Sequence, residues 1–319
     1  MNEFKIINDY FKILSRNNPA AKNLNDDVFF DKKNRLVISV DTYNFGIHFI
    51  DFKYPYYVLK KIIRSSLSDL ICKGVIPKYY FLSGGGNKMT FTKKNLSLIT
   101  KSLNEEQNKY SIKIGGGDTV YSKKPSFTVT MIGFSKKIVE RNNAKKNDDI
   151  YVTGDIGDSY LGLKVLKKKN KLTGKLKKYF IKKYYCPDIP YNFSKKIINF
   201  ATSSIDISDG LISDMEKLIN NQNLSFNLYV DKIPTSTQMN KYLYKKKENK
   251  LNFLFNGDDY QILFTSPKKN RTLIKSLAKK MNQKVSLIGN INSGKKKNLL
   301  LQGNKSLKLG KFRGYSHKF

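Results

Sequence analysis

Short apolar runs that end in glycine, serine or aspartate recur along this 319-residue chain, and segments with helical periodicity separate them. The runs "RLVISVDTY" at 35–43 and "SFTVTMIGF" at 126–134 are typical of β-strands, and 251–267 predicts two strands joined by a tight turn. A long amphipathic segment at 55–73 predicts a helix that ends at Gly74. Strands and helices interleave and no unit of roughly 20–50 residues repeats, so the sequence predicts an α/β (α+β) fold.

A polar segment at 135–147 ("SKKIVERNNAKKN") is the predicted boundary between two domains. The chain is long for a single hydrophobic core. We therefore predict an N-terminal domain at 1–136 and a C-terminal domain at 137–319. In the second domain, the spacing of Ser213 and Glu216 fits a capping box that opens a helix.

The composition is strongly basic, because 60 Lys and Arg residues against 25 Asp and Glu give a formal net charge of +35. One interpretation is a basic nucleic-acid-binding protein. The other is that lysine fills ordinary solvent-facing positions. We favour the second, because the lysines are scattered and lack the aromatic interleaving of a strand-binding surface. We expect no specific nucleic-acid partner.

The sequence carries no signal for an oxidising compartment or a membrane. Cys72 and Cys186 have no second Cys or His at metal-ligand spacing, so we expect both to be reduced. The predicted helix at 2–15 places Phe4 and Ile7 on one face but lacks the apolar core of a signal peptide. No run approaches the roughly 20 apolar residues that span a bilayer. We expect a cytoplasmic protein with no membrane partner.

Carboxylates stand among Gly, Ser and Thr at the ends of several apolar runs. Hard cations such as Mg²⁺ take oxygen ligands and usually reach their sites together with substrate phosphates. The pattern therefore predicts a protein that handles polyphosphates. The acidic clusters are Asp26-Asp27, Asp41, Asp69, Asp118, Asp206 with Asp209, and Asp258-Asp259.

Asp69 lies inside the apolar arc of the predicted helix at 55–73. It follows Ile62 by seven residues, which places it roughly 20° away at 100° per residue. A carboxylate in that arc must be compensated, because an unpaired buried charge is costly. We favour a metal ion. The alternative is an aspartate at the edge of the arc that pairs with a lysine.

Two pairs of polar residues share one spacing. Ser39 and Asp41 are two apart on a predicted strand and therefore point to the same face. Asp206 and Ser208 repeat this spacing, and Asp209 follows them. Two oxygens side by side at the end of a strand suit a cation. The alternative is turn or cap chemistry, which the repetition makes less favourable.

A glycine run at 115–117 follows a predicted strand and leads into Asp118. Glycine N–H groups can approach a phosphate closely, and a neighbouring Asp can hold a bridging metal, although many such runs are simple turns. The run is no P-loop, because no Lys-Ser/Thr follows. His48 and His317 are the two histidines, and they support no nucleophilic relay. A phosphate acceptor needs no general base, so catalysis can rest on positioning and metals.

These motifs, in this order, resemble thiamine-monophosphate kinase, of the superfamily that includes aminoimidazole ribonucleotide synthetase. They span nearly the whole chain, and together they are specific although each alone is modest. The matching stretches are "NDDV" (25–28), "VISVDTYNFGIHF" (37–49), "SLSDLICKGVIP" (66–77), "GGDT" (116–119), "TVTMIGF" (128–134), "DDIYVTGDIGDSYLGL" (148–163), "SIDISDGLISD" (204–214), "GDDYQILFT" (257–265) and "RGYSHKF" (313–319).

The resemblance implies ATP-dependent phosphorylation of thiamine monophosphate to thiamine diphosphate. It implies direct in-line transfer assisted by several Mg²⁺ ions, with no catalytic side chain of its own. The implied metal ligands are Asp27, Ser39, Val40 through its backbone carbonyl, Asp41, Asp69, Asp118, Asp206 and Asp209. The implied ATP contacts are Gly117, Asp118, Arg141 and Ser208. The implied contacts of the thiamine substrate are His48, Asp258 and Tyr315, the last by stacking.

The resemblance also implies two α/β domains with the active site between them, and N-terminal sheets that pair across a homodimer. The chain departs from the usual family pattern at four positions: Asn25 and Asn256 stand where Gly is usual, Asp258 where Glu (sometimes Asp) is usual, and Gln261 where Glu is usual. Asn tolerates positive φ, so we expect the turns to survive, whereas Asp258 is one methylene shorter. The alternative function is a related enzyme that acts on another phosphorylated or carbonyl acceptor.

Overall fold

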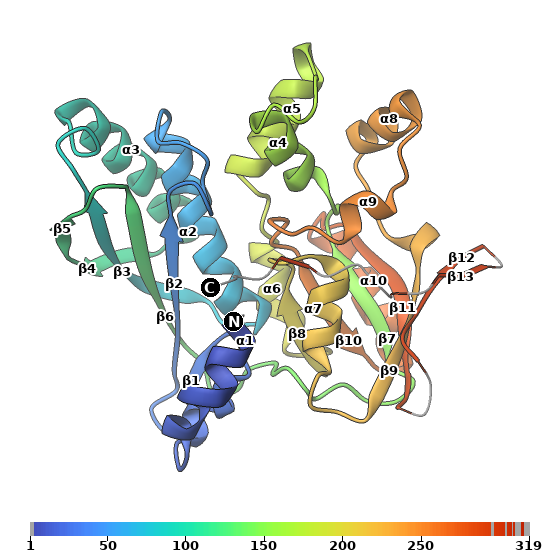
Figure 1. Ribbon diagram of the computed structural model, residues 1–319. Helices are drawn as coiled ribbons and strands as arrows, with labels where there is room; N and C mark the ends of the chain where they lie inside the picture. The colour runs from blue at the N-terminus through green and yellow to red at the C-terminus, as the bar shows by residue number, and fades with distance from the viewer. Residues whose placement is uncertain (1–2, 295–296, 304, 308, 310–313, 316–319) are drawn as a thin grey trace.

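The computed structural model describes residues 3–294, 297–303, 305–307, 309 and 314–315. Figure 1 shows two β-sheets that stand side by side, each with its own helices. The first sheet uses strands between residues 29 and 134, and the second uses strands between 149 and 307. The predicted α/β class is therefore confirmed. Among the described helices, none has both the length and the apolar character of a membrane span.

The first sheet has six strands in the order β1-β2-β6-β3-β4, with β5 paired to β3. Along β6 the side chains of Phe127, Val129 and Met131 are buried, whereas those between them face outward. This period of two is that of a sheet covered on one face. The strands are β1 Phe29–Asp31, β2 Leu36–Asn44, β3 Pro77–Gly86, β4 Lys113–Gly116, β5 Thr119–Tyr121 and β6 Ser126–Phe134.

Helix α2 (Pro55–Cys72) is the central element of the molecule. It packs with α3 (Lys93–Tyr110) on the inner face of the first sheet, and it also contacts β8 and β10 of the second sheet. Almost all of its residues are buried, as expected for a helix that is covered on every side. Gly74 ends the helix with a φ of 76°, and a Cβ there would lie 3.0 Å from Ile197 Cγ2.

The second sheet has seven strands in the order β13-β12-β9-β11-β7-β10-β8. Its strands are β7 Asp149–Thr153, β8 Ser203–Asp206, β9 Leu224–Tyr229, β10 Ile262–Ser266, β11 Val285–Ser293, β12 Leu299–Gln302 and β13 Lys305–Leu307. The helices of this half are α4 Asp158–Leu166, α5 Gly174–Tyr185, α6 Tyr191–Ile197, α7 Leu211–Leu218, α8 Thr237–Lys246, α9 Leu251–Leu254 and α10 Arg271–Lys280, with the short turns η4 Val230–Lys232 and η5 Lys268–Asn270.

The N-terminal segment is helical but is not one α-helix. It runs as α1 (Glu3–Ile6), a π-helical turn η1 (Ile7–Phe11) and a 3₁₀ turn η2 (Lys12–Ser15), and η3 (Pro19–Leu24) follows. Of its first thirteen described residues, Ser15 is the one that is buried. The apolar face predicted for this segment therefore covers a cavity wall and solvent-facing surface instead of a core.

The strand predicted at the start of 251–267 is wrong. Residues 251–254 form α9, and an irregular segment leads from it into β10. Phe253 packs with the cluster around α4 and α5, whereas Leu254 packs in the core behind the second sheet. Two apolar neighbours thus serve two clusters in different directions, which a half-buried strand cannot provide, and short apolar runs do not distinguish these cases.

The predicted capping box is also wrong. Helix α7 begins at Leu211, so Ser213 and Glu216 lie inside it. The carboxylate of Asp214 instead accepts hydrogen bonds from the backbone N–H groups of Asp209 and Gly210, at 3.0 and 3.1 Å. A side chain from the first turn therefore satisfies the donors that precede the helix.

Candidate active site

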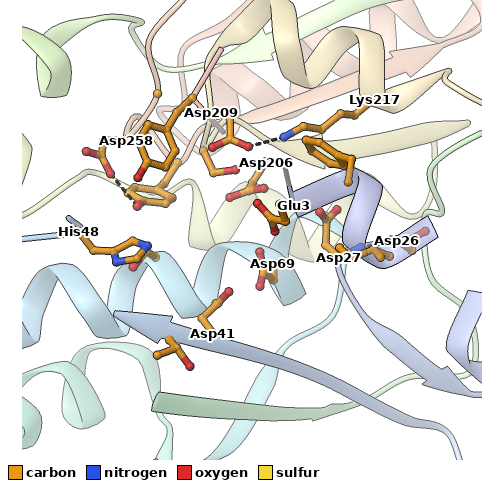
Figure 2. Close-up of a pocket in the computed structure, with 18 of the residues that line it drawn as sticks. Glu3, Asp26, Asp27, Asp41, His48, Asp69, Asp206, Asp209, Lys217 and Asp258 are labelled. Carbon is orange, nitrogen blue, oxygen red and sulfur yellow. Dashed lines mark hydrogen bonds and ion pairs between the residues drawn. The ribbon is translucent and has the colours of Figure 1, made fainter. Parts of the chain in front are cut away.

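A cavity of about 610 Å³ lies where the N-terminal helices, β2, α2 and the segment after β8 meet. Figure 2 shows carboxylates from these elements pointing into one space. Most of the site residues predicted from the sequence line it. They are Asp27, Val40, Asp41, His48, Asp69, Arg141, Asp206, Ser208, Asp209, Asp258 and Tyr315.

Three carboxylates form the centre of the cavity, namely Asp41 from β2, Asp69 from α2 and Asp206 from β8. Burial raises the pKa of Asp69 well above its usual range, and the charges of Asp41 and Asp206 raise it further. Burial also raises the pKa of Asp206 to about 6, although Ser68 Oγ donates to its Oδ2 at 2.6 Å. Mutual repulsion of this kind is relieved by a cation between the groups.

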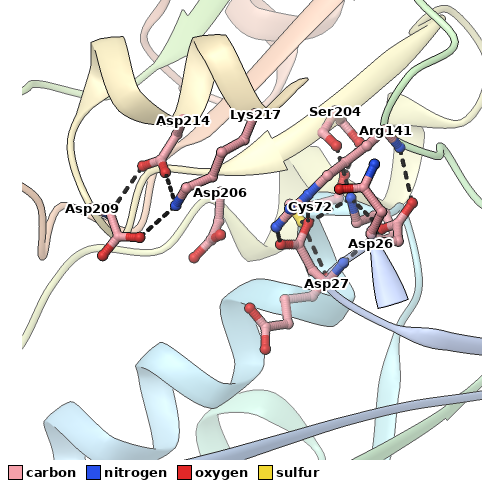
Figure 3. A network of polar contacts seen from close by, with 12 residues as sticks. Asp26, Asp27, Cys72, Arg141, Ser204, Asp206, Asp209, Asp214 and Lys217 are labelled. Atoms are coloured by element: carbon pink, nitrogen blue, oxygen red, sulfur yellow. Dashed lines mark hydrogen bonds and ion pairs between the residues drawn. The ribbon is translucent and has the colours of Figure 1, made fainter. Parts of the chain in front are cut away.

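Asp26 and Asp27 form a second acidic group beside the first. Lys73 Nζ is fully buried and lies 2.8 Å from Asp26 Oδ1 and 2.6 Å from Asp27 Oδ2. Arg141 pairs with both oxygens of Asp27, and its backbone N–H donates to Asp26 Oδ2 at 2.9 Å. Figure 3 shows the contacts of Arg141 with Asp26 and Asp27. Two cations therefore fix the acidic loop that precedes β1.

Asp209 lies at the opposite end of the acidic group and pairs with Lys217 of α7. Lys217 Nζ also lies 2.8 Å from Asp214 Oδ1, so one ammonium bridges the two carboxylates. Burial acts to lower the pKa of Lys217, but the two carboxylates outweigh it and raise the pKa. Asp209 is thus held at the start of α7 with one face toward the cavity.

The donor set fits Mg²⁺. Asp27, Cys72 and Asp206 can bring one ligand atom each to within 4.8 Å of one another. Cys72 Sγ lies 3.1 Å from the carbonyl oxygen of Asp69, and burial raises the pKa of the thiol well above its usual value. A protonated thiol is a poor ligand for a hard cation. The oxygens of Asp27, Asp41, Asp69 and Asp206 are therefore the candidate ligands.

Ser39 and Val40 lie on opposite faces of β2. Ser39 is 3% exposed, its Oγ has no hydrogen-bond partner among the described residues, and it does not line the cavity. Val40 is 62% exposed and lines the cavity rim. As predicted, the side chains of Ser39 and Asp41 share a face of β2. Asp41 lines the cavity, whereas Ser39 does not.

Gly117 and Asp118 lie apart from this cavity, at the turn between β4 and β5. A Cβ at Gly117 would lie 1.9 Å from the carbonyl oxygen of Leu82, so only glycine fits so close to β3. The Asp118 carbonyl accepts from the Gly84 N–H at 2.8 Å, and its carboxylate accepts from the Thr119 N–H at 2.7 Å. Both residues lie at an exposed end of the first sheet.

His48 and Asp258 lie at another part of the cavity wall (Figure 2). Tyr315 also lines the cavity, and its backbone N–H donates to the Asp209 carbonyl at 3.2 Å. His48 Nδ1 accepts from the backbone N–H of Asn44 at 2.9 Å, which assigns the ring proton of the neutral form to Nε2. Asp258 accepts from Tyr260 Oη at 2.8 Å and pairs with Lys61 Nζ at 2.9 Å. Of "RGYSHKF", residues 314–315 are described, whereas Arg313 and residues 316–319, including His317, lie outside the described residues.

Two of the departures from the family pattern have local explanations. Asn25 has a φ of −124°, so positive φ is not what this position requires. Its amide forms a reciprocal pair with the amide of Asn220, with two hydrogen bonds of 3.0 Å. Gln261 is buried, accepts from Thr153 Oγ1 at 2.9 Å and donates to the Asp188 carbonyl at 2.6 Å. Both substitutions are therefore accommodated by neutral hydrogen bonds.

Sequence reasoning missed the lysines of the site and its N-terminal wall. Lys73 and Lys217 hold the acidic residues, and Glu3 of α1 lines the same cavity. Figure 2 shows the Glu3 side chain among those of Asp69 and Asp206. The available signal for Lys73 was its position at the end of the apolar helical pattern at 55–73. The position of Glu3 depends on a long-range contact that no local pattern contains.

Comparison with known proteins gives a consistent result. The family model "AIR synthase related protein, N-terminal domain" matches residues 24–135. The chain is 34% identical to thiamine-monophosphate kinase of Buchnera aphidicola subsp. Schizaphis graminum, over 99% of this chain and 98% of that protein. It is 30% identical to thiamine-monophosphate kinase of Escherichia coli (strain K12), over 84% of each.

Solved structures agree with these relatives. The structure of "AaThiL complexed with AMPPCP and TMP" aligns with a TM-score of 0.86 at 25% identity, over 99% of this chain and 97% of that one. E. coli HypE, a hydrogenase maturation protein, aligns with a TM-score of 0.69 at 15% identity and shares the fold alone.

The matched N-terminal domain and the two-sheet fold define a protein of the AIR synthase-related class. Sequence identity over nearly the full length of the Buchnera relative narrows this class to one family. The chain belongs to the thiamine-monophosphate kinase family.

Proposed function

We propose that this protein transfers the γ-phosphoryl group of ATP to thiamine monophosphate and releases thiamine diphosphate and ADP. The observation that carries the proposal is a single cavity that is lined by buried carboxylates and also by His48, Asp258 and Tyr315. The relative whose fold aligns over 99% of this chain was solved with AMPPCP and TMP. We also propose that the protein lies in the cytoplasm, where an enzyme of this class would meet both substrates.

Several Mg²⁺ ions would be held by Asp27, Asp41, Asp69, Asp206 and Asp209, with Ser39, Val40 and Asp118 as the further ligands that the family pattern implies. When bound, Mg²⁺ neutralises charge on the phosphoryl oxygens and aligns them. The chain's own residues shield Asp206 from bulk solvent, because Asp206 is 2% exposed and α1, α2 and β8 form walls of the cavity. No described residue is placed as a nucleophile, so we propose direct in-line transfer.

Nucleotide contacts would extend from the cavity across the outer face of the first sheet. Arg141 and Ser208 line the cavity, whereas Asp118 lies at the far side of this face. Thr42 pairs in register with Thr128 and Thr128 with Ser83, and β5 begins beside the next residue of β3. Three strand spacings separate Asp118 from the cavity rim, roughly 14 Å, which an extended triphosphate nucleotide can span.

The same outer face supports a homodimer. Tyr79, Phe81, Val120 and Phe134 are between 37% and 53% exposed on it. An apolar sheet face of this kind is rarely left to water in a soluble protein. We propose that two copies pair through this face.

We also propose that the boundary between the two domains of each copy lies at residues 136–137.

The test is incubation of the purified protein with ATP, Mg²⁺ and thiamine monophosphate. We expect thiamine diphosphate and ADP in one-to-one yield, and loss of both with EDTA. If the protein binds ATP but forms no thiamine diphosphate, the assignment of thiamine monophosphate as the acceptor is overturned. Chiral γ-phosphoryl ATP tests the mechanism, because in-line transfer inverts the phosphorus once, whereas retention would indicate a phosphoenzyme.

A further inference from the structure

Lys61 is a buried cation whose contacts lead to the substrate end of the cavity. It lies on α2, and its side chain is 2% exposed. Its Nζ lies 2.9 Å from Asp258 Oδ2, and this ion pair is its one polar contact among the described residues. Burial lowers the pKa of Lys61, whereas Asp258 acts to raise it. A buried ammonium with a single carboxylate partner constrains that partner strongly.

The carboxylate of Asp258 is fixed from two directions. Lys61 holds Oδ2, and Tyr260 Oη donates to Oδ1 at 2.8 Å. The backbone is fixed as well, because Asp258 N–H donates to the Ser208 carbonyl and Tyr260 N–H to the Ile207 carbonyl, each at 2.9 Å. Asp258 and Tyr260 have φ values of 68° and 50°. Left-handed backbone at non-glycine residues persists only where its surroundings impose it.

Lys61 also reaches His48 through one intermediate. Its Nζ lies 3.6 Å from the centre of the Tyr184 ring, a cation–π contact. The hydroxyl of Tyr184 donates to the carbonyl oxygen of His48 at 3.1 Å. One ammonium from α2 therefore contacts the groups that fix two of the three residues at the substrate end.

We propose that Lys61 is a positioning residue for the acceptor substrate, which orients Asp258 directly and His48 through Tyr184. Asp258 is 26% exposed, so its remaining lone pairs face the cavity as acceptors. Because Lys61 already balances its charge, Asp258 recognises an N–H donor such as the amine of an aminopyrimidine ring better than it attracts a cation. This assignment rests on the proposed function, in which the acceptor is thiamine monophosphate.

The test compares Lys61→Met with Lys60→Met. Lys60 is the neighbouring buried lysine of α2, and it pairs with Glu105 and Glu106, away from the cavity. We expect Lys61→Met to raise KM for thiamine monophosphate by about 10- to 100-fold while KM for ATP stays within about twofold. Lys60→Met should leave both KM values near those of the wild type.

A double-mutant cycle separates positioning from general loss of structure. If Lys61 acts through Asp258, Lys61→Met added to Asp258→Asn should cost much less than it does alone. Additive effects, or a wild-type KM in Lys61→Met, would overturn the proposal. If Lys61→Met does not fold, Lys61→Gln and Tyr184→Phe replace it, and wild-type KM values in both would overturn it equally. A wild type that makes no thiamine diphosphate would instead overturn the proposed function.

Discussion

Lys73 Nζ lies 2.6 Å from Asp27 Oδ2, and neither side chain is more than 6% exposed. The same ammonium contacts Asp26 and donates to the carbonyl oxygen of Ser204 at 2.8 Å. Lys73 is the residue directly after α2, whereas Ser204 belongs to β8. One cation thus joins the acidic loop, the central helix and the second sheet at the edge of the cavity.

Replacing Lys73 with Met should destabilise the protein strongly. The change leaves Asp26 and Asp27 buried without one of their cations, and removing one partner of such a group costs about 3–5 kcal/mol. Chemical denaturation measures this loss. Lys78→Met, at an exposed position of β3, is the matched control and should change the free energy of unfolding little. Equal stability of the two variants would contradict the assignment.

Asp69→Asn should reduce kcat/KM by more than about 100-fold while the protein stays folded. The substitution removes one negative charge from the cluster of three carboxylates that are the candidate metal ligands. It also relieves repulsion from Asp41 and Asp206, so the metal-free variant should melt at a higher temperature than the wild type. Asp9→Asn, at an exposed position that does not line the cavity, is the control for both measurements. Normal turnover in Asp69→Asn would refute the metal assignment.

Asp118→Asn should separate the nucleotide from the acceptor. Because Asp118 lies three strands from the cavity rim, we expect weaker ATP binding and an unchanged affinity for thiamine monophosphate. Calorimetric titration of each ligand in the presence of Mg²⁺ measures this. Loss of both affinities would instead place Asp118 in the shared acidic group.

The effect of Mg²⁺ on thermal stability should disappear as the pH falls through about 6. Asp206 has its pKa raised to about 6, and it must be deprotonated to hold a cation. In the metal-free protein the sign is opposite, because a raised carboxyl pKa means that the folded state binds more protons. Asp206 therefore destabilises the fold increasingly as pH rises from about 4 to 6, by on the order of 3 kcal/mol. Metal-free Asp206→Asn, melted across this range, should lack that trend.

Phe81→Glu should weaken the proposed dimer by at least tenfold in Kd, about 1.4 kcal/mol. Phe81 is 40% exposed on the outer sheet face, and a carboxylate there would be desolvated by a second copy. Sedimentation at several concentrations measures the change. Tyr244→Glu, at a position that is 90% exposed on α8, is the control. A wild type that stays monomeric at every concentration would exclude the dimer.

Local patterns predicted most of the fold. The run at 126–134 forms β6 with the predicted bounds, because its alternating side chains match a sheet with one covered face. The pattern failed at 251–254, where neighbouring apolar residues serve two different clusters. It also failed at Ser213, because Asp214, inside α7, accepts the hydrogen bonds of the backbone N–H groups before the helix.

The candidate site was predictable only where its residues carry a motif. Asp41, Asp69 and Asp206 stand in such motifs and meet in one cavity. Lys61 and Lys73 looked like ordinary members of a basic composition, and their roles emerge only when α2 is packed between the two sheets. Tertiary structure decides which lysine is buried. The charge and spacing of residues along the chain do not reveal this.

Helix α2 belongs to both halves of the molecule, and this affects how the chain can come apart. It lies against β6 of the first sheet and against β8 and β10 of the second, so neither half can expose its interior without stripping this helix. Heating should accordingly give a single cooperative transition instead of two separate ones. A fragment that starts at residue 137 would lack the helix that covers part of its own interior, and we expect it to need the N-terminal half in trans in order to fold.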